Sequence, residues 1–198
     1  MRVTWIDVYS DMIPHFKRDS DKDLQVVVNG IIQTYEEEGG RTEEVTIDPH
    51  LVTIAGFFSS RNIEGIGFNY PYHANSWKYM SGDISGSLGE AITSVLMDVK
   101  FGIGITDVVR MRVSKFMGIL TDMVIEVNKY PKLIDFLGKE GLVFMNTRSS
   151  VFYKKDYLKR GLEKDLISSE ILRYPDNFSL LFYVFLNEDK VLGVVVRP

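Results

Sequence analysis

The stretch GILTDMVIEVNKYPKLIDFLGKEGLVFMNTRSS, residues 118–150, decides the fold of this chain. Over 121–127, Met123, Ile125 and Val127 share one face of a strand, and 141–149 contains the apolar run LVFM, so both segments are predicted to be strands. Between these runs, PKLIDFLGKEG (131–141) has proline near its start and glycine near its end, which is typical of a short helix. The stretch therefore predicts two strands joined by a short helix.

The flanking segments extend this pattern on both sides. Apolar residues recur at helical spacing over 81–104, where Gly102 supplies a stop, and an amphipathic helix is predicted over 154–174. Strand patterns occur over 106–113 and in a closing hairpin over 179–198, which turns at 187–190. This order of helices and strands predicts an α/β fold with a mixed central sheet flanked by helices.

Residues 1–80 are predicted to be a β-rich N-terminal extension or subdomain that precedes an α/β core over 81–198. The segment 24–38 is apolar and rich in β-branched residues, and 43–58 resembles two short strands around a turn at Asp48-Pro49. These residues either add strands to the main sheet or form an appendage. No repeat or low-complexity segment is visible.

Composition excludes several classes of protein. The chain has 198 residues, 45% of them hydrophobic, which is enough for one domain with a substantial core. It has no cysteine and only three histidines, so neither a disulfide scaffold nor a cysteine or multi-histidine metal site is expected. No apolar run reaches about 18 residues. We therefore expect a cytoplasmic protein that neither enters a membrane nor is exported.

The distribution of charge bears on nucleic-acid binding. The net charge is −4, and residues 1–80 hold 7 Lys and Arg against 12 Asp and Glu, whereas residues 81–198 hold 16 against 15. Only the second part could present a cationic surface to a phosphate backbone. Its one compact basic cluster comprises Lys154, Lys155, Lys159 and Arg160, a candidate for phosphate or DNA contacts that acidic residues interrupt, as on an ordinary solvated helix face.

Four polar residues form the candidate site. Asn146 and Arg148 are two apart in one predicted strand and therefore point to the same face. Pairing with the preceding strand would bring Asp122 beside them at one edge of the sheet. Glu90, from the helix over 81–104, would add a second carboxylate. An alternative arrangement uses Asp122 and Glu126 as ligands with Lys129 beside them, but about 13 Å of strand separates the two acids at about 3.3 Å per residue.

The order of elements and these residues resemble the PD-(D/E)xK nuclease superfamily, which includes restriction endonucleases and Holliday-junction resolvases. GSLGEAITSVL is similar to the family helix that carries a glutamate, TDMVIE to the strand that starts with an aspartate, and LVFMNTRSS to the strand that ends in Glu-x-Lys. The resemblance covers residues 86–198. It implies a restriction-endonuclease-like core, DNA as the partner and hydrolysis of phosphodiesters with Mg²⁺ or Mn²⁺, with Asp122, Glu90 and Asn146 as metal ligands.

The chain has Thr121 where the family has a proline before the aspartate, and it departs from the family at two further positions. Asn146 replaces an acid and brings no charge to a metal, while Arg148 replaces the lysine. An arginine is a poor proton acceptor but can clamp a phosphate with two parallel hydrogen bonds. The replacements favour phosphate binding over hydrolysis.

Two alternative interpretations stay open. Ser87 and Glu90 match an S-x-x-E capping box, in which both side chains satisfy backbone groups at a helix start. The whole scaffold could also be catalytically inactive and bind a protein or a nucleic acid, or form a homodimer. The surfaces considered for that role are the closing hairpin and an aromatic segment containing Tyr70, Tyr72, Trp77 and Tyr79.

Overall fold

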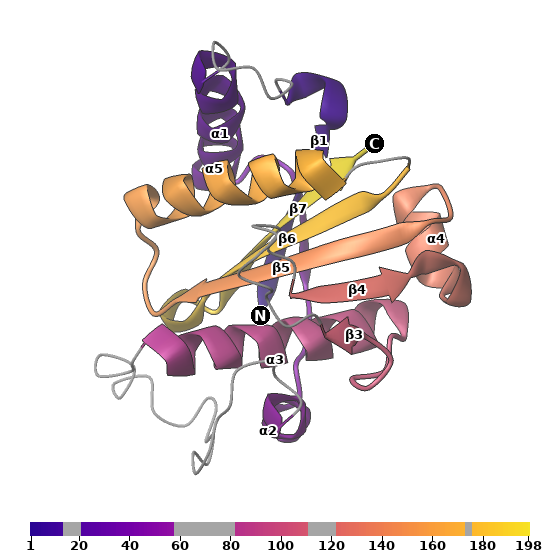
Figure 1. Cartoon of the computed structure of the whole chain (residues 1–198). Helices are drawn as coiled ribbons and strands as arrows, with labels where there is room; N and C mark the ends of the chain where they lie inside the picture. The colour runs from indigo at the N-terminus through magenta and orange to yellow at the C-terminus, as the bar shows by residue number, and fades with distance from the viewer. Residues whose placement is uncertain (14–20, 58–81, 111–121, 173–175) are drawn as a thin grey trace.

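The computed structural model describes residues 1–13, 21–57, 82–110, 122–172 and 176–198, and its centre is a seven-stranded mixed sheet (Figure 1). The strands are β1 (Arg2–Tyr9), β2 (Arg41–Glu44), β3 (Val109–Arg110), β4 (Met123–Glu126), β5 (Leu142–Ser150), β6 (Phe178–Phe185) and β7 (Lys190–Arg197). The helices are α1 (Asp21–Glu36), α2 (Pro49–Phe57), α3 (Gly82–Phe101), α4 (Pro131–Leu137) and α5 (Lys155–Leu172). The predicted α/β fold with a mixed sheet and flanking helices is confirmed.

The strands lie in the order β2-β1-β7-β6-β5-β4-β3. The pairs β1–β7 and β5–β6 are parallel, and all other neighbours are antiparallel. All eight residues of β6 are buried, because this strand lies in the middle of the sheet between helical layers. The strands of the closing hairpin are therefore part of the core, and the exposed surface of the hairpin includes its turn at 187–189.

Helices cover both faces of the sheet (Figure 1). One core lies between the sheet and α2, α3 and α4, and it includes Val143 and Met145 of β5. The other lies between the sheet and α1 and α5, and it includes Leu181 and Tyr183 of β6. Met123 and Ile125 of β4 are buried in the first core, as the alternation of side chains along a strand predicts. None of the described helices combines the length and the apolar character needed to cross a bilayer.

The long helix α3 packs very closely against β5. A Cβ atom at Gly89 would lie 2.6 Å from the Cβ of Ser149, so only glycine permits this approach. The Ser149 hydroxyl donates a hydrogen bond to the Ser85 carbonyl, which fixes the same contact. Helix α3 and the strand that carries Asn146 are thus in direct contact.

From residue 82 onward the predicted elements are confirmed in kind and order. Helix α3 ends at Phe101 and is followed by Gly102, whose φ of +72° is a backbone conformation that glycine favours. The β6–β7 turn has Asp189 at φ +53°. The predicted strand 106–113 appears as β3, and its residues 111–113 lie outside the described residues.

The predictions for residues 1–80 were partly wrong. Residues 24–38 are not a strand but most of α1, because their apolar side chains recur at helical spacing and pack against α5 and the sheet. Within 43–58 only the first predicted strand exists, as the end of β2, and the second is helix α2. Strands β1 and β2 extend the main sheet, as the first of the two alternatives for this segment stated.

The capping-box interpretation was also wrong. Helix α3 begins at Gly82, so Ser87 and Glu90 lie within the helix rather than at its first turn. Both residues are 2% exposed. Glu90 is therefore a buried acid on the helix layer that covers one face of the sheet.

Candidate functional site

Asp122 and Asn146 lie opposite each other where β4 begins. The register of the strands, with Met123 facing Met145, brings them together. The Asp122 amide donates to Asn146 Oδ1 at 3.2 Å, and Asp122 Oδ2 accepts the Thr147 amide at 2.7 Å. These reciprocal bonds tie the start of β4 to the middle of β5, so both side chains contribute to the structure of the sheet.

Arg148 lies further along β5 and binds helix α5. Its Nε and Nη2 atoms donate to Asp165 Oδ2 and Oδ1 at 2.7 and 2.6 Å, a bidentate pair. The Tyr183 hydroxyl donates to Asp165 Oδ2 at 2.8 Å. The Arg148 side chain is 27% exposed and that of Asp165 2%, so the carboxylate sits beneath the guanidinium.

The surroundings of Arg148 and Tyr183 raise the pKa of both groups. Burial lowers the pKa of Arg148, but the hydrogen bonds and charge of Asp165 outweigh it, so the pKa lies above its ordinary value. Burial, followed by the charge and hydrogen bond of Asp165, raises the pKa of Tyr183 well above its ordinary value. Arg148 therefore stays a cation and Tyr183 stays a hydrogen-bond donor.

The close packing of α5 over the triad depends on Gly161. A Cβ atom there would lie 2.9 Å from Tyr183 Cε1 and 3.0 Å from Arg148 Cδ. A glycine at this position lets the helix backbone press on both side chains. Sequence, packing and ion pairing thus combine to bind the Arg148 side chain to α5.

The residues present do not form the metal site that the family resemblance implies. Glu90 belongs to α3, and α5, which binds Arg148, covers the opposite face of the sheet (Figure 1). The described part of the chain contains no group of three or more His, Cys, Asp or Glu side chains that could hold a metal ion. Of the proposed ligands, the structure brings together Asp122 and the uncharged Asn146. We derive no catalytic step through a metal.

The other candidate residues have ordinary surface partners. Lys129 Nζ lies 2.6 Å from Glu126 Oε2, so the two residues of the alternative arrangement pair with each other. In the basic cluster, Lys155 binds Glu36 of α1 at 2.7 Å, while Lys154 and Arg160 are exposed. The aromatic segment around Tyr70 to Tyr79 lies outside the described residues.

Asp165 and Tyr183 were missed as site residues. Asp165 is one of the acidic residues near the basic cluster that were predicted to lie on a solvated helix face, which was wrong, because it is 1% exposed. A signal was present in the sequence. Asp165 lies seven residues after Leu158 and three after Leu162, on the helical stripe that is otherwise apolar. An acid on such a stripe indicates a buried cationic or hydroxyl partner.

Comparison of the chain with protein-family models, with curated proteins and with solved structures finds no match. The class of the protein is therefore defined by its own fold and site. It is an α/β protein with a mixed seven-stranded sheet, an Asp122–Asn146 pair between two strands, and a buried triad of Arg148, Asp165 and Tyr183.

Proposed function

We propose that this protein is a nuclease-like scaffold that binds DNA without cleaving it. The observation that carries the proposal is the bidentate pairing of Arg148 with the buried Asp165. An arginine whose charge is matched inside the fold has little capacity left to clamp a scissile phosphate. Arg148, which stands at the family's lysine position, thereby stabilises the fold.

The order of elements supports the nuclease-like part of the proposal. Helix α3, strands β3, β4 and β5 and helix α5 follow one another as the resemblance implies. Asp122 and Asn146 occupy facing positions on neighbouring strands, as the family's aspartate and its acid do in the resemblance. The neutral amide of Asn146 supports loss of catalysis, since it adds no charge to a Mg²⁺ or Mn²⁺ site.

The first prediction concerns Asp122. Asp122→Ala should lower the free energy of unfolding by about 2 kcal/mol, because it removes a carboxylate that accepts a backbone amide. Denaturation in urea measures this change. Asp122→Asn, which keeps an acceptor oxygen, should lose less.

Metal binding distinguishes a structural from a catalytic Asp122. Calorimetric titration with Mn²⁺ should give the same result for the wild type and for Asp122→Ala, and the wild type should not nick plasmid DNA in Mn²⁺. Binding of Mn²⁺ that disappears in Asp122→Ala, together with nicking, would establish metal-dependent hydrolysis and overturn the proposal.

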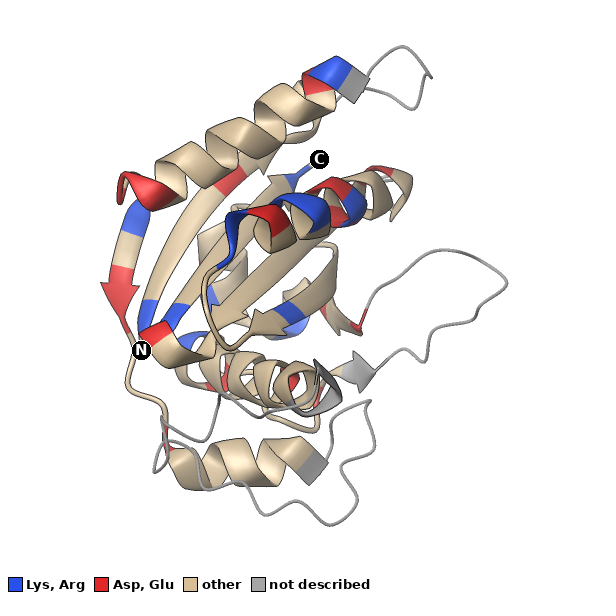
Figure 2. Cartoon of the chain, turned by 90° about the vertical axis from the view of Figure 1, so that its left-hand side faces the viewer, with Lys and Arg blue, Asp and Glu red and all other residues tan. Residues whose placement is uncertain are grey.

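The start of α5 is the surface we assign to DNA. Figure 2 shows basic residues at this end of the helix, interleaved with acidic ones. Lys154 and Arg160 are exposed there, and Lys159 is partly exposed. Contacts of lysine and arginine with phosphates supply the sequence-independent part of DNA affinity.

The second prediction follows from this surface. The double variant Lys154→Glu, Arg160→Glu should bind a fluorescent DNA duplex at least about 10-fold more weakly, because two phosphate contacts become repulsive. Fluorescence anisotropy over a series of salt concentrations measures both the affinity and its dependence on salt. The slope of log K against log salt should become shallower by about one for each lost contact.

Lys132→Glu is the matched control. Lys132 is exposed on α4, at the other end of the sheet from the start of α5 (Figure 1). This variant should bind like the wild type. If DNA does not bind, and a protein or a second copy of the chain binds with little response to salt, the scaffold is a protein-binding module instead. We place the proposed DNA binding in the cytoplasm.

A further inference from the structure

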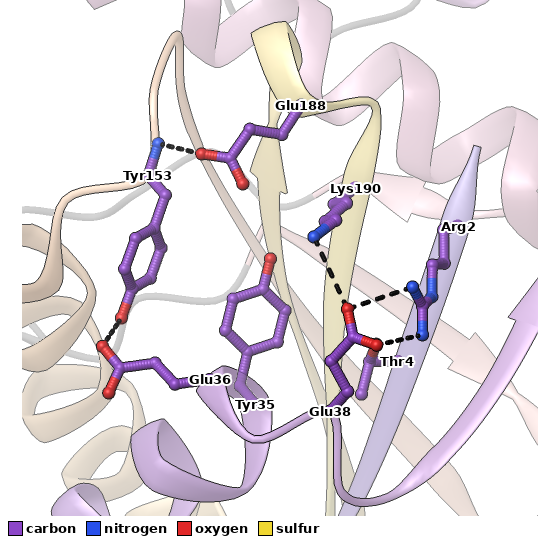
Figure 3. Close-up of a pocket in the computed structure, with 8 residues that line it drawn as sticks. All are labelled: Arg2, Thr4, Tyr35, Glu36, Glu38, Tyr153, Glu188 and Lys190. Atoms are coloured by element: carbon purple, nitrogen blue, oxygen red, sulfur yellow. Dashed lines mark hydrogen bonds and ion pairs between the residues drawn. The ribbon is translucent and has the colours of Figure 1, made fainter.

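A polar pocket lies between the N-terminal segment and the closing hairpin (Figure 3). Its volume is about 210 Å³. The residues that line it come from β1, the end of α1 and the turn after it, the segment before α5, and the β6–β7 turn: Arg2, Thr4, Tyr35, Glu36, Glu38, Tyr153, Glu188 and Lys190. The proposed function uses none of these residues.

The cationic groups of the pocket already have anionic partners. Arg2 donates from Nη1 and Nη2 to the two oxygens of Glu38, both at 3.1 Å. Lys190 Nζ lies 4.0 Å from the same carboxylate. An anionic ligand would have to displace Glu38 from this arginine. The pocket is therefore poorly suited to a phosphate or a carboxylate.

Glu36 also has its partners. Its Oε1 accepts the Tyr153 hydroxyl at 2.6 Å, and its Oε2 accepts Lys155 Nζ at 2.7 Å. These bonds, with that of Lys155 first, lower the pKa of Glu36. Both oxygens of this carboxylate are thus used in holding α1 to the start of α5.

Two acceptors in the pocket retain spare capacity. Glu188 Oε1 accepts the Tyr153 amide at 3.0 Å, and Figure 3 shows the other oxygen directed toward the Tyr35 hydroxyl. The Tyr35 hydroxyl is buried and has no hydrogen-bond partner. A buried polar atom without a partner is unfavourable, and a ligand that bonds to it recovers the lost interaction.

Aromatic rings surround these acceptors. The Tyr35 and Tyr153 rings lie 5.7 Å apart between centroids, and both contact Phe185 at 5.6 and 5.3 Å. Burial and the charge of Glu188 raise the pKa of Tyr35, so its hydroxyl stays neutral. Electron-rich ring faces beside an uncompensated carboxylate oxygen are the surroundings that favour a cation.

We propose that this pocket binds the primary ammonium group of a small amine or of a lysine side chain. The ammonium donates one hydrogen bond to the second oxygen of Glu188 and another to the Tyr35 hydroxyl oxygen, while the tyrosine rings contact its carbon chain. Two of its three donors bond to the two spare acceptors and the third can bond to water, whereas an anion would find the cations of the pocket already paired.

Calorimetric titration of the full chain with putrescine tests the proposal, with acetate as the anionic comparison. We expect putrescine to bind and acetate not to. Glu188→Gln should weaken binding at least about 10-fold, because a charged acceptor is lost, and Tyr35→Phe should weaken it roughly 5-fold. A peptide with one internal lysine identifies the source of the ammonium: tighter binding than putrescine indicates a protein lysine, and weaker binding a free amine.

Glu37→Gln is the matched control. Like Glu188→Gln it removes one negative charge, but Glu37 is an exposed residue of the turn after α1 and does not line the pocket. It should bind putrescine like the wild type. Circular dichroism should show that Tyr35→Phe, which keeps the ring, retains the fold. Absence of putrescine binding, binding that survives Glu188→Gln, or tighter binding of acetate would each overturn the proposal.

Discussion

Asp165→Asn should lower the free energy of unfolding by about 3 kcal/mol, as expected when one partner of a buried ion pair is removed. The change takes away the carboxylate that receives two bonds from Arg148 and one from Tyr183. We expect the lower end of the range for buried pairs, since Arg148 is still 27% exposed and water can solvate part of its charge. Chemical denaturation followed by circular dichroism measures the loss.

Two variants make this result specific. Asp156→Asn removes an exposed carboxylate from the first turn of the same helix and should cost less than about 1 kcal/mol. The triple variant Arg148→Met, Asp165→Leu, Tyr183→Phe replaces the whole triad with apolar groups and should recover most of the lost stability. An Asp165→Asn protein that unfolds at the wild-type denaturant concentration would contradict a structural role for the triad.

The sequence could predict those parts of the fold that local patterns specify. In β4, the position of Met123 and Ile125 two residues apart identified the buried face, and Gly102 follows the end of helix α3 as expected. Both signals depend on residues close together in the chain. The α1 segment was misread because β-branched residues such as Val28 and Ile31 favour strands weakly, whereas packing against α5 decides the outcome.

The candidate site was less predictable, because partner choice depends on distant residues. Alternation along β5 put Asn146 and Arg148 on one face, and pairing with β4 brought Asp122 to Asn146. The apolar stripe around Asp165 indicated that this acid is buried, but no local pattern indicated that its partner would be Arg148, 17 residues away. The polar pocket depends on longer separations still, such as the 35 residues between Tyr153 and Glu188.

Trp5→Ala should be the most destabilising single change, with a loss of about 3 to 5 kcal/mol, as expected for removal of a buried tryptophan. Trp5 is 3% exposed and packs edge-on against three rings from different elements. The ring centroids of Phe101 (α3), Phe136 (α4) and Phe182 (β6) lie 6.4, 5.0 and 5.6 Å from it. A cavity at this point would separate β1 from three elements at once.

Trp5 also takes part in a charged contact. Its indole Nε1 donates to Glu43 Oε1 of β2, which also pairs with Lys100, and the Lys100 ammonium lies 5.3 Å from the Trp5 ring. Trp5→Phe keeps an aromatic ring but loses this donor, so it should cost less than Trp5→Ala. Urea denaturation ranks the two variants.

Hydrogen exchange then locates the effect of Trp5→Ala. Trp5 connects β1 to α3 and α4, and Glu43 of β2 contacts it on the same face. The amides of 2–9 and 41–44 should therefore lose more protection in Trp5→Ala than those of β5 and β6. The β5 and β6 strands pair with each other and keep their own helical cover, so their protection should fall only with global stability. Equal loss of protection throughout the sheet would show that Trp5 supports the whole core rather than the attachment of its N-terminal strands.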